Sequence, residues 1–184
     1  SNISTRNEGK RIAFDICPVN IVLNRYASIL GKKYDKNGNI ARNGKVNEKI
    51  LTSLNSLGFY AEHPPKSLGI EWVNQNIIPL LENETPQNIL ATFTEHAADQ
   101  IAKIFNHYQF KNVLFTGGGT YNSYLIERIK AKSATDIIIP TRELIDFKEA
   151  LIFAFMGILK MNNEINVLCS ATGSSGDHSS GIIV

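Results

Sequence analysis

The sequence predicts an α/β fold, a layered domain in which helices cover strands that pair partly in parallel. The second half of the chain alternates helix, strand, helix, strand and helix, an order typical of parallel strands joined by crossover helices. Two short apolar stretches, residues 113–115 and 136–140, separate segments whose apolar residues recur at helical spacing. The chain of 184 residues is long enough to bury a core, and one domain is expected.

The first half of the chain predicts one strand, two helices and two irregular stretches. Residues 11–15 form a short strand that ends in a carboxylate, and Pro18 opens a helix that continues to Leu30. Residues 31–44 are a polar loop rich in turn-forming residues. A short helix is expected over residues 46–57, and the Pro-rich stretch 64–69 is irregular.

The second half contains the strongest helix signals. Thr85 and Pro86 begin a long amphipathic helix that extends to Phe105, and a further helix is expected over residues 121–132. The helix over residues 147–161 is so apolar that we expect it to be largely buried. The polar tail that follows ends in three apolar residues, 182–184, a candidate docking strand.

Composition excludes several classes of protein. Apolar residues make up 43% and charged residues 20%, and the net charge is +2, without a basic stripe for nucleic acid. No apolar run approaches the ~20 residues that cross a bilayer. The two cysteines, Cys17 and Cys169, and the four histidines have no metal-ligand spacing, so no metal site is expected from protein side chains. A cytoplasmic protein with free thiols is predicted, with a disulfide as the alternative.

The most informative motif is the triple glycine Gly117, Gly118 and Gly119, between a predicted strand and a predicted helix. Without Cβ atoms the backbone can lie against a bound group, and a helix N-terminus offers unpaired N–H donors. The motif therefore predicts a phosphate or nucleoside site. The alternative is a glycine-rich turn without a ligand, since the spacing is neither that of a Rossmann nor that of a Walker loop. Asn122 either touches the ligand or caps the next helix.

For each of the other candidate residues, a catalytic or binding role and a purely structural role are both open. Asp15, at a strand end before a Pro-containing loop, is a candidate general base or a capping or turn aspartate. Glu149 is a candidate ligand or a first-turn glutamate favoured by the helix dipole. Lys66 and Ser67 either contact a substrate or hold their own loop.

Four stretches together resemble the anhydro-N-acetylmuramic acid kinases, sugar kinases of the actin- and hexokinase-like superfamily. Phe-Asp-Ile-Cys-Pro-Val-Asn at residues 14–20 is similar to the family pattern Phe-Asp-x-Gly-Pro-Gly-Asn. The second stretch is Tyr-Asp-Lys-Asn-Gly at 34–38, and the third is Pro-Lys-Ser-Leu-Gly-Ile-Glu at 65–71. The fourth is Gly-Gly-Gly-Thr-Tyr-Asn at 117–122, with Glu-Ala and Phe-Ala following at 149–154. The ordered set covers nearly the whole chain and is more specific than any one motif.

The resemblance implies a ribonuclease H-like lobe of the actin/hexokinase type, with a helical insertion over about residues 31–81. It implies ATP-dependent phosphorylation at O6 of an anhydro amino sugar, with hydrolytic opening of the 1,6-anhydro ring, in cell-wall recycling. ATP and Mg²⁺ are the implied cofactors, and a homodimer is an oligomeric state to test. Asp15 would then be the catalytic base, the three glycines and Asn122 would bind the nucleotide, and Glu149, Lys66 and Ser67 would bind the sugar.

The same resemblance predicts a single C-terminal lobe, residues 1–184, of a protein about twice as long. Residues 1–4 are similar to the end of a family segment, Asn-Ile-Gly-Gly-x-Ser-Asn, and the family's Ser-Gly-Thr-Ser-x-Asp-Gly phosphate loop does not occur in this sequence. We therefore expect this chain alone to be inactive. The alternative is a non-catalytic relic that binds a sugar or nucleotide, and the gene sequence upstream of Ser1 discriminates between the two.

Three residues depart from the family pattern. Cys17 and Val19 stand where the family has glycine, so we expect the loop after Asp15 to differ in backbone or packing. Asn24 stands where an aspartate is expected.

Overall fold

The structure is a computed structural model that describes residues 1–183, and it is a mixed α/β arrangement with small sheets. Helices dominate, and the strands form two separate pairs. In chain order the elements are β1 (Asn2–Asn7), β2 (Lys10–Asp15), α1 (Asn20–Ile29), the 3₁₀ turn η1 (Lys36–Gly38), α2 (Asn39–Asn43), α3 (Glu48–Asn55), η2 (Gly58–Ala61), α4 (Ile70–Asn76), α5 (Ile78–Leu81), α6 (Pro86–His107), β3 (Asn112–Leu114), η3 (Gly118–Tyr121), α7 (Ser123–Lys130), β4 (Asp136–Ile138), α8 (Arg142–Met161) and α9 (Cys169–Thr172).

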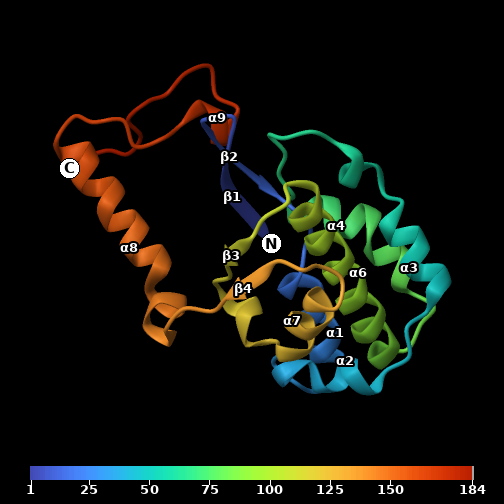
Figure 1. Cartoon of the computed structure of the whole chain (residues 1–184). Helices are drawn as coiled ribbons and strands as arrows, with labels where there is room; N and C mark the ends of the chain where they lie inside the picture. Colours follow the sequence, from blue (N-terminus) through green and yellow to red (C-terminus); the bar gives the residue numbers. More distant parts are fainter. Residues whose placement is uncertain (184) are drawn as a thin grey trace.

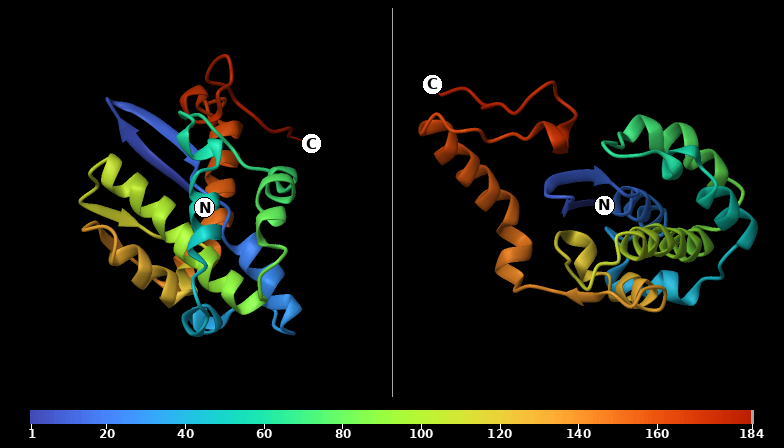
Figure 2. Two further views of the ribbon diagram at one scale, coloured as in Figure 1. Left: turned by 90° about the vertical axis from the view of Figure 1, so that its right-hand side faces the viewer. Right: turned by 45° about the horizontal axis from the view of Figure 1, so that its top comes forward.

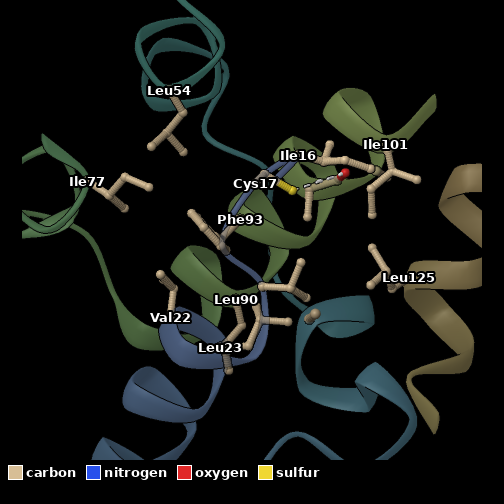
Figure 3. Close-up of a cluster of buried hydrophobic side chains, with 14 of the residues drawn as sticks. Ile16, Cys17, Val22, Leu23, Leu54, Ile77, Leu90, Phe93, Ile101 and Leu125 are labelled. Atoms are coloured by element: carbon tan, nitrogen blue, oxygen red, sulfur yellow. Dashed lines mark hydrogen bonds between the residues drawn. The ribbon is translucent and has the colours of Figure 1, made fainter. Parts of the chain in front are cut away.

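Helix α6 is the centre of the core (Figure 1). It begins as predicted, because the Thr85 hydroxyl accepts a hydrogen bond from the Asn88 amide and Pro86 occupies the first turn. Helices α1, α2, α3 and α7 pack around it. Figure 3 shows side chains from several of these helices meeting between them, including Val22, Leu54 and Phe93, each of which is fully buried.

The two strand pairs differ in direction. β1 and β2 form an antiparallel hairpin in which Asn2 lies opposite Asp15, and its turn residues Glu8 and Gly9 both have positive φ. β3 and β4 are parallel, with Asn112 opposite Asp136, so the predicted parallel pairing is confirmed. The coarse α/β class is therefore confirmed. The ribonuclease H-like lobe stays a prediction, because the two strand pairs are not joined in one sheet.

The stretch over residues 31–81 is helical, with η1, α2, α3, η2, α4 and α5. The predicted irregular loop 31–44 is wrong at its centre, where η1 and α2 form. Asp35 explains the difference, because its carboxylate is buried and accepts hydrogen bonds from the Ile40 and Ala41 amides at 2.9 Å. Asn47 likewise caps α3 by accepting from the amides of Lys49 and Ile50.

Helix α8 ends at Met161 as predicted but begins at Arg142, before the predicted start at residue 147, and the expectation that it is largely buried is wrong. Of its 20 residues only Ile145 is buried, and Phe153 is 69% exposed. Figure 2 shows α8 leaving β4 and extending away from the other helices before the tail returns toward the β1–β2 hairpin. Ile182 and Ile183 are exposed and form no strand, and Val184 lies outside the described residues. Among the helices of residues 1–183, none combines the length and apolar character of a membrane span.

Candidate functional site

Several of the predicted site residues line one cavity of about 730 Å³. β1 and the loop after β2 form one wall, and β3 with the glycine loop forms another. Asp15, the three glycines 117–119 and Glu149 all belong to its lining, although Asp15 is more than 100 residues from the others in sequence. The structure thus brings the candidate base, the candidate nucleotide loop and one candidate sugar ligand to a common space.

Asp15 is the last residue of β2 and is half-buried. Its amide donates to the Lys66 carbonyl at 3.0 Å, and its Oδ2 accepts from the Leu68 amide at 2.7 Å. Helix α1 begins after Val19 without a side-chain cap, so Asp15 is not a helix cap. A carboxylate held through one oxygen by a backbone donor has its orientation fixed, as a general base requires.

The glycine loop turns sharply at Gly117, whose φ is +81°. The helix predicted to follow at residue 121 starts at Ser123, because residues 118–121 form the 3₁₀ turn η3. A Cβ placed on Gly117 or Gly119 would meet nothing within 4 Å, and one on Gly118 would meet only the Asn20 Nδ2 atom, at 3.2 Å. The backbone of this loop therefore faces open space, which fits the close approach of a nucleotide.

Asn122 has a different place from the glycines. Its side-chain oxygen accepts from the Leu125 amide at 3.0 Å, and only 8% of the residue is exposed. It thus caps α7. Asn122 does not belong to the cavity lining, so its placement favours the capping alternative over contact with the nucleotide.

Glu149 is the eighth residue of α8, so the first-turn interpretation is wrong for it; the acidic residue of that turn is Glu143. Glu149 is exposed toward the cavity beside Lys148, whose Nζ donates to the Thr116 Oγ1 at 2.8 Å. Sequence analysis missed Lys148, a cation between the glycine loop and the candidate sugar ligand. The only signal for it was a Lys–Glu pair before the apolar run.

Lys66 and Ser67 line a second cavity of about 370 Å³, which Asp15 also borders. The Lys66 Nζ donates to the Phe59 carbonyl at 2.8 Å and lies 4.4 Å from the centre of the Phe59 ring. Burial lowers the pKa of Lys66 from its usual value. These contacts hold the loop, whereas Ser67 is exposed.

Two of the family departures lie in the loop after Asp15. Cys17 and Val19 are both buried, and neither has a positive φ, although Val19 (φ −133°, ψ −87°) lies outside the helical and extended regions. Burial raises the pKa of the Cys17 thiol. Asn24 lies exposed on α1 and does not line either cavity.

Carboxylates are few at this site. No group of three potential metal-ligating side chains exists within residues 1–183, and the main cavity has Asp15 and Glu149 as its acidic lining residues. Two carboxylates with a glycine loop fit a hard cation that is held mainly through phosphate oxygens, as Mg²⁺ commonly is.

Comparison with known proteins gives a consistent result. The family model "Anhydro-N-acetylmuramic acid kinase" matches residues 1–184, and the chain belongs to this family of carbohydrate kinases. The relative from Francisella tularensis subsp. novicida is 35% identical over 176 residues, which cover 88% of this chain and 46% of the relative. The relative from Mannheimia succiniciproducens is 30% identical over all of this chain and 54% of its own length. A Bacillus cereus relative is 33% identical, with 93% and 49% covered. The chain spans about half the length of these curated relatives, all named anhydro-N-acetylmuramic acid kinase.

Proposed function

We propose that this chain is the C-terminal lobe of an anhydro-N-acetylmuramic acid kinase. The reaction couples phosphorylation at O6 by ATP to hydrolytic opening of the 1,6-anhydro ring, in cytoplasmic recycling of cell-wall sugars. The observation that carries the proposal is the shared cavity, which Asp15, the glycine loop and Glu149 line together. Family membership supports the reaction class. The assignment to the C-terminal lobe rests on the resemblance of the four motifs alone.

Asp15 is the proposed base. Opening the anhydro ring requires a water to attack C1, and a carboxylate that removes a proton from this water makes it a better nucleophile. Oδ2 accepts from the Leu68 amide, so Oδ1 is the oxygen proposed to receive the proton. Glu149, on the α8 side of the same cavity, would accept hydrogen bonds from sugar hydroxyls.

The backbone of residues 117–119 would lie against the nucleotide, where its open space admits a phosphate or ribose. Lys148 would place a positive charge near the phosphates. ATP with Mg²⁺ supplies the phosphoryl group and neutralises its charge. Glu149 is the acidic side chain of this cavity, besides the proposed base, that could reach such a cation, directly or through water.

Phosphoryl transfer depends on groups that hold the phosphates in line from both sides. The family's serine-rich phosphate loop does not occur in these 184 residues. We therefore expect the purified 184-residue chain not to phosphorylate the anhydro sugar, and to become active only as part of a protein that supplies that loop, here called the two-lobe kinase. Turnover by the chain alone would contradict the proposal that phosphoryl transfer requires groups from both lobes.

The test is Asp15→Asn in the two-lobe kinase. The substitution preserves shape and removes the base, so kcat should fall by on the order of 10²–10⁴ while the KM values for sugar and ATP stay nearly unchanged. Asp136→Asn is the matched control, since Asp136 is exposed on β4 and lines neither cavity. A near-normal kcat for Asp15→Asn would remove Asp15 from the mechanism, whereas a two-lobe protein that binds ATP or the sugar without any turnover would favour the non-catalytic relic.

A further inference from the structure

The core contains a buried polar cluster that the proposed chemistry does not use. His96 on α6 is fully buried. Its Nε2 lies 2.8 Å from the Tyr60 hydroxyl, and its Nδ1 lies 2.7 Å from the Asn55 Oδ1. A polar cluster inside a helical core costs free energy unless each group is paired, so its retention calls for a structural reason.

The donor and the acceptor of each hydrogen bond in this cluster can be assigned. The Asn55 Nδ2 donates to the Asp99 Oδ2 at 2.9 Å, which fixes the orientation of the amide and leaves its Oδ1 as an acceptor. The His96 Nδ1 must then carry the proton, and the Nε2 must accept the proton of the Tyr60 hydroxyl. The His96 Nε2 thus accepts from the Tyr60 hydroxyl and fixes the position of the Tyr60 side chain against the core.

Tyr60 belongs to η2 and is adjacent to Phe59, whose side chain is 5% exposed. The Phe59 ring centre lies 5.7 Å from that of Tyr60 and 5.4 Å from that of Trp72. Since this aromatic group is anchored to His96, the Phe59 carbonyl and ring occupy fixed places. Both are the partners of the Lys66 ammonium.

Lys66 in turn connects to Asp15. Its carbonyl accepts from the Asp15 amide, and two residues later the Leu68 amide donates to the Asp15 carboxylate. A continuous series of contacts therefore runs from the centre of α6 to the carboxylate at the end of β2. The links are hydrogen bonds, ring contacts and the backbone of residues 66–68, and the last one holds a single carboxylate oxygen.

We propose that Lys66 and Tyr60 are positioning residues, which hold the segment 66–68 against Asp15 so that its carboxylate faces the main cavity. Lys66 then acts through the Phe59 carbonyl and its own backbone and does not bind the sugar. The proposal rests on the base role of Asp15 for its kinetic consequence, while its geometric part is independent of that role.

The geometric part is tested in the 184-residue chain by amide hydrogen exchange. Lys66→Met keeps the aliphatic stem and removes the ammonium, and Tyr60→Phe removes only the hydroxyl that His96 accepts. Each should speed exchange of the Leu68 amide at least tenfold and leave the Leu90 amide in the middle of α6 unchanged. Lys32→Met, at an exposed lysine after α1, should change neither amide.

Two results would overturn the geometric part. One is unchanged exchange at Leu68 in both variants. The other is an equal rise at Leu68 and Leu90, which would mean that both substitutions act on global stability alone.

The kinetic part is tested in the two-lobe kinase. Lys66→Met should lower kcat about tenfold with the sugar KM changed less than twofold, and should have no further effect when Asp15 is already Asn. A raised KM at unchanged kcat would make Lys66 a substrate ligand and overturn the proposal. Failure of the proposed function would appear differently, as a near-normal kcat for Asp15→Asn alone.

Discussion

Helices α6 and α8 have similar lengths and opposite surroundings. Of the 22 residues of α6, 14 are buried, and they include polar side chains such as His96 and Thr92. Helix α8 contains long apolar runs, yet Ile145 is its only buried residue. Apolar composition therefore indicates that a helix needs a partner, and the position of the helix in the fold decides whether the described chain supplies one.

The difference follows from where each helix is attached. Helix α6 has neighbours on several sides, and ion pairs of Glu95 with Arg128 and Lys132 join it to the α7 region. Burial disfavours the charged form of Glu95, but these two cations hold its pKa below the usual value. Helix α8 is held near its N-terminus, where Lys148 contacts Thr116 and Tyr121 contacts Asp146.

The largest expected effect is the difference in stability between alanine substitutions of one phenylalanine in α6 and one in α8. Phe93→Ala in α6 should lower the free energy of unfolding by about 3–5 kcal/mol, because a fully buried ring leaves a cavity. Phe153→Ala in α8 should change it by less than ~0.5 kcal/mol in the 184-residue chain, since the ring is exposed. Urea denaturation of both variants measures this, and equal losses would contradict the exposure of α8.

The second effect is the pH dependence of the free energy of unfolding that results from the buried His96 in α6. Burial lowers the pKa of His96 to about 3, with Asp99 opposing the shift and Lys103 adding to it. The unfolded chain, with the usual His pKa of about 6.5, binds the proton first, so stability falls as pH drops from about 6.5 toward 3. The slope from this group should approach about 1.4 kcal/mol per pH unit.

His96→Gln should flatten that slope between pH 6 and pH 4 in denaturation curves. His107→Gln is the matched control in the same helix, because His107 is exposed and the substitution should preserve the slope. A wild-type curve that is flat over this range would mean that His96 is not held neutral by burial.

A third, smaller effect is the difference in stability between two alanine substitutions in the glycine loop, which α8 contacts. Gly117 has positive φ, so Gly117→Ala should cost about 1–2 kcal/mol of stability through backbone strain. Gly119→Ala should cost less than ~0.5 kcal/mol, because its φ is ordinary and the added methyl meets open space. Thermal unfolding compares the two, and equal losses would show that strain is not confined to Gly117.

Local signals predicted the elements that local chemistry determines. Thr85 and Pro86 mark the start of α6, and the apolar runs mark β3 and β4. β1 was not predicted, because its residues are mostly polar and the strand exists through its pairing with β2. The burial of α8 was predicted wrongly because sequence periodicity contains no information about which surface lies opposite a helix.

The candidate site shows the same division. Asp15 and the glycines could be singled out from the sequence, but their common cavity depends on contacts between distant segments. The Leu68 amide that holds Asp15 could not be predicted, because every residue other than proline has such a donor. The role of Asn122 was left open by the sequence, and the Leu125 contact favours the cap.

The central claim is that the glycine loop faces the nucleotide in the cavity that Asp15 also lines. The most direct test is the dissociation constant for ATP of Gly118→Ala in the two-lobe kinase. The added methyl would project toward Asn20 without backbone strain, so it should disturb a ligand more than the fold. The account predicts a dissociation constant raised more than tenfold with a nearly unchanged melting temperature. An unchanged dissociation constant with a clearly lower melting temperature would contradict it and make the triple glycine a structural turn.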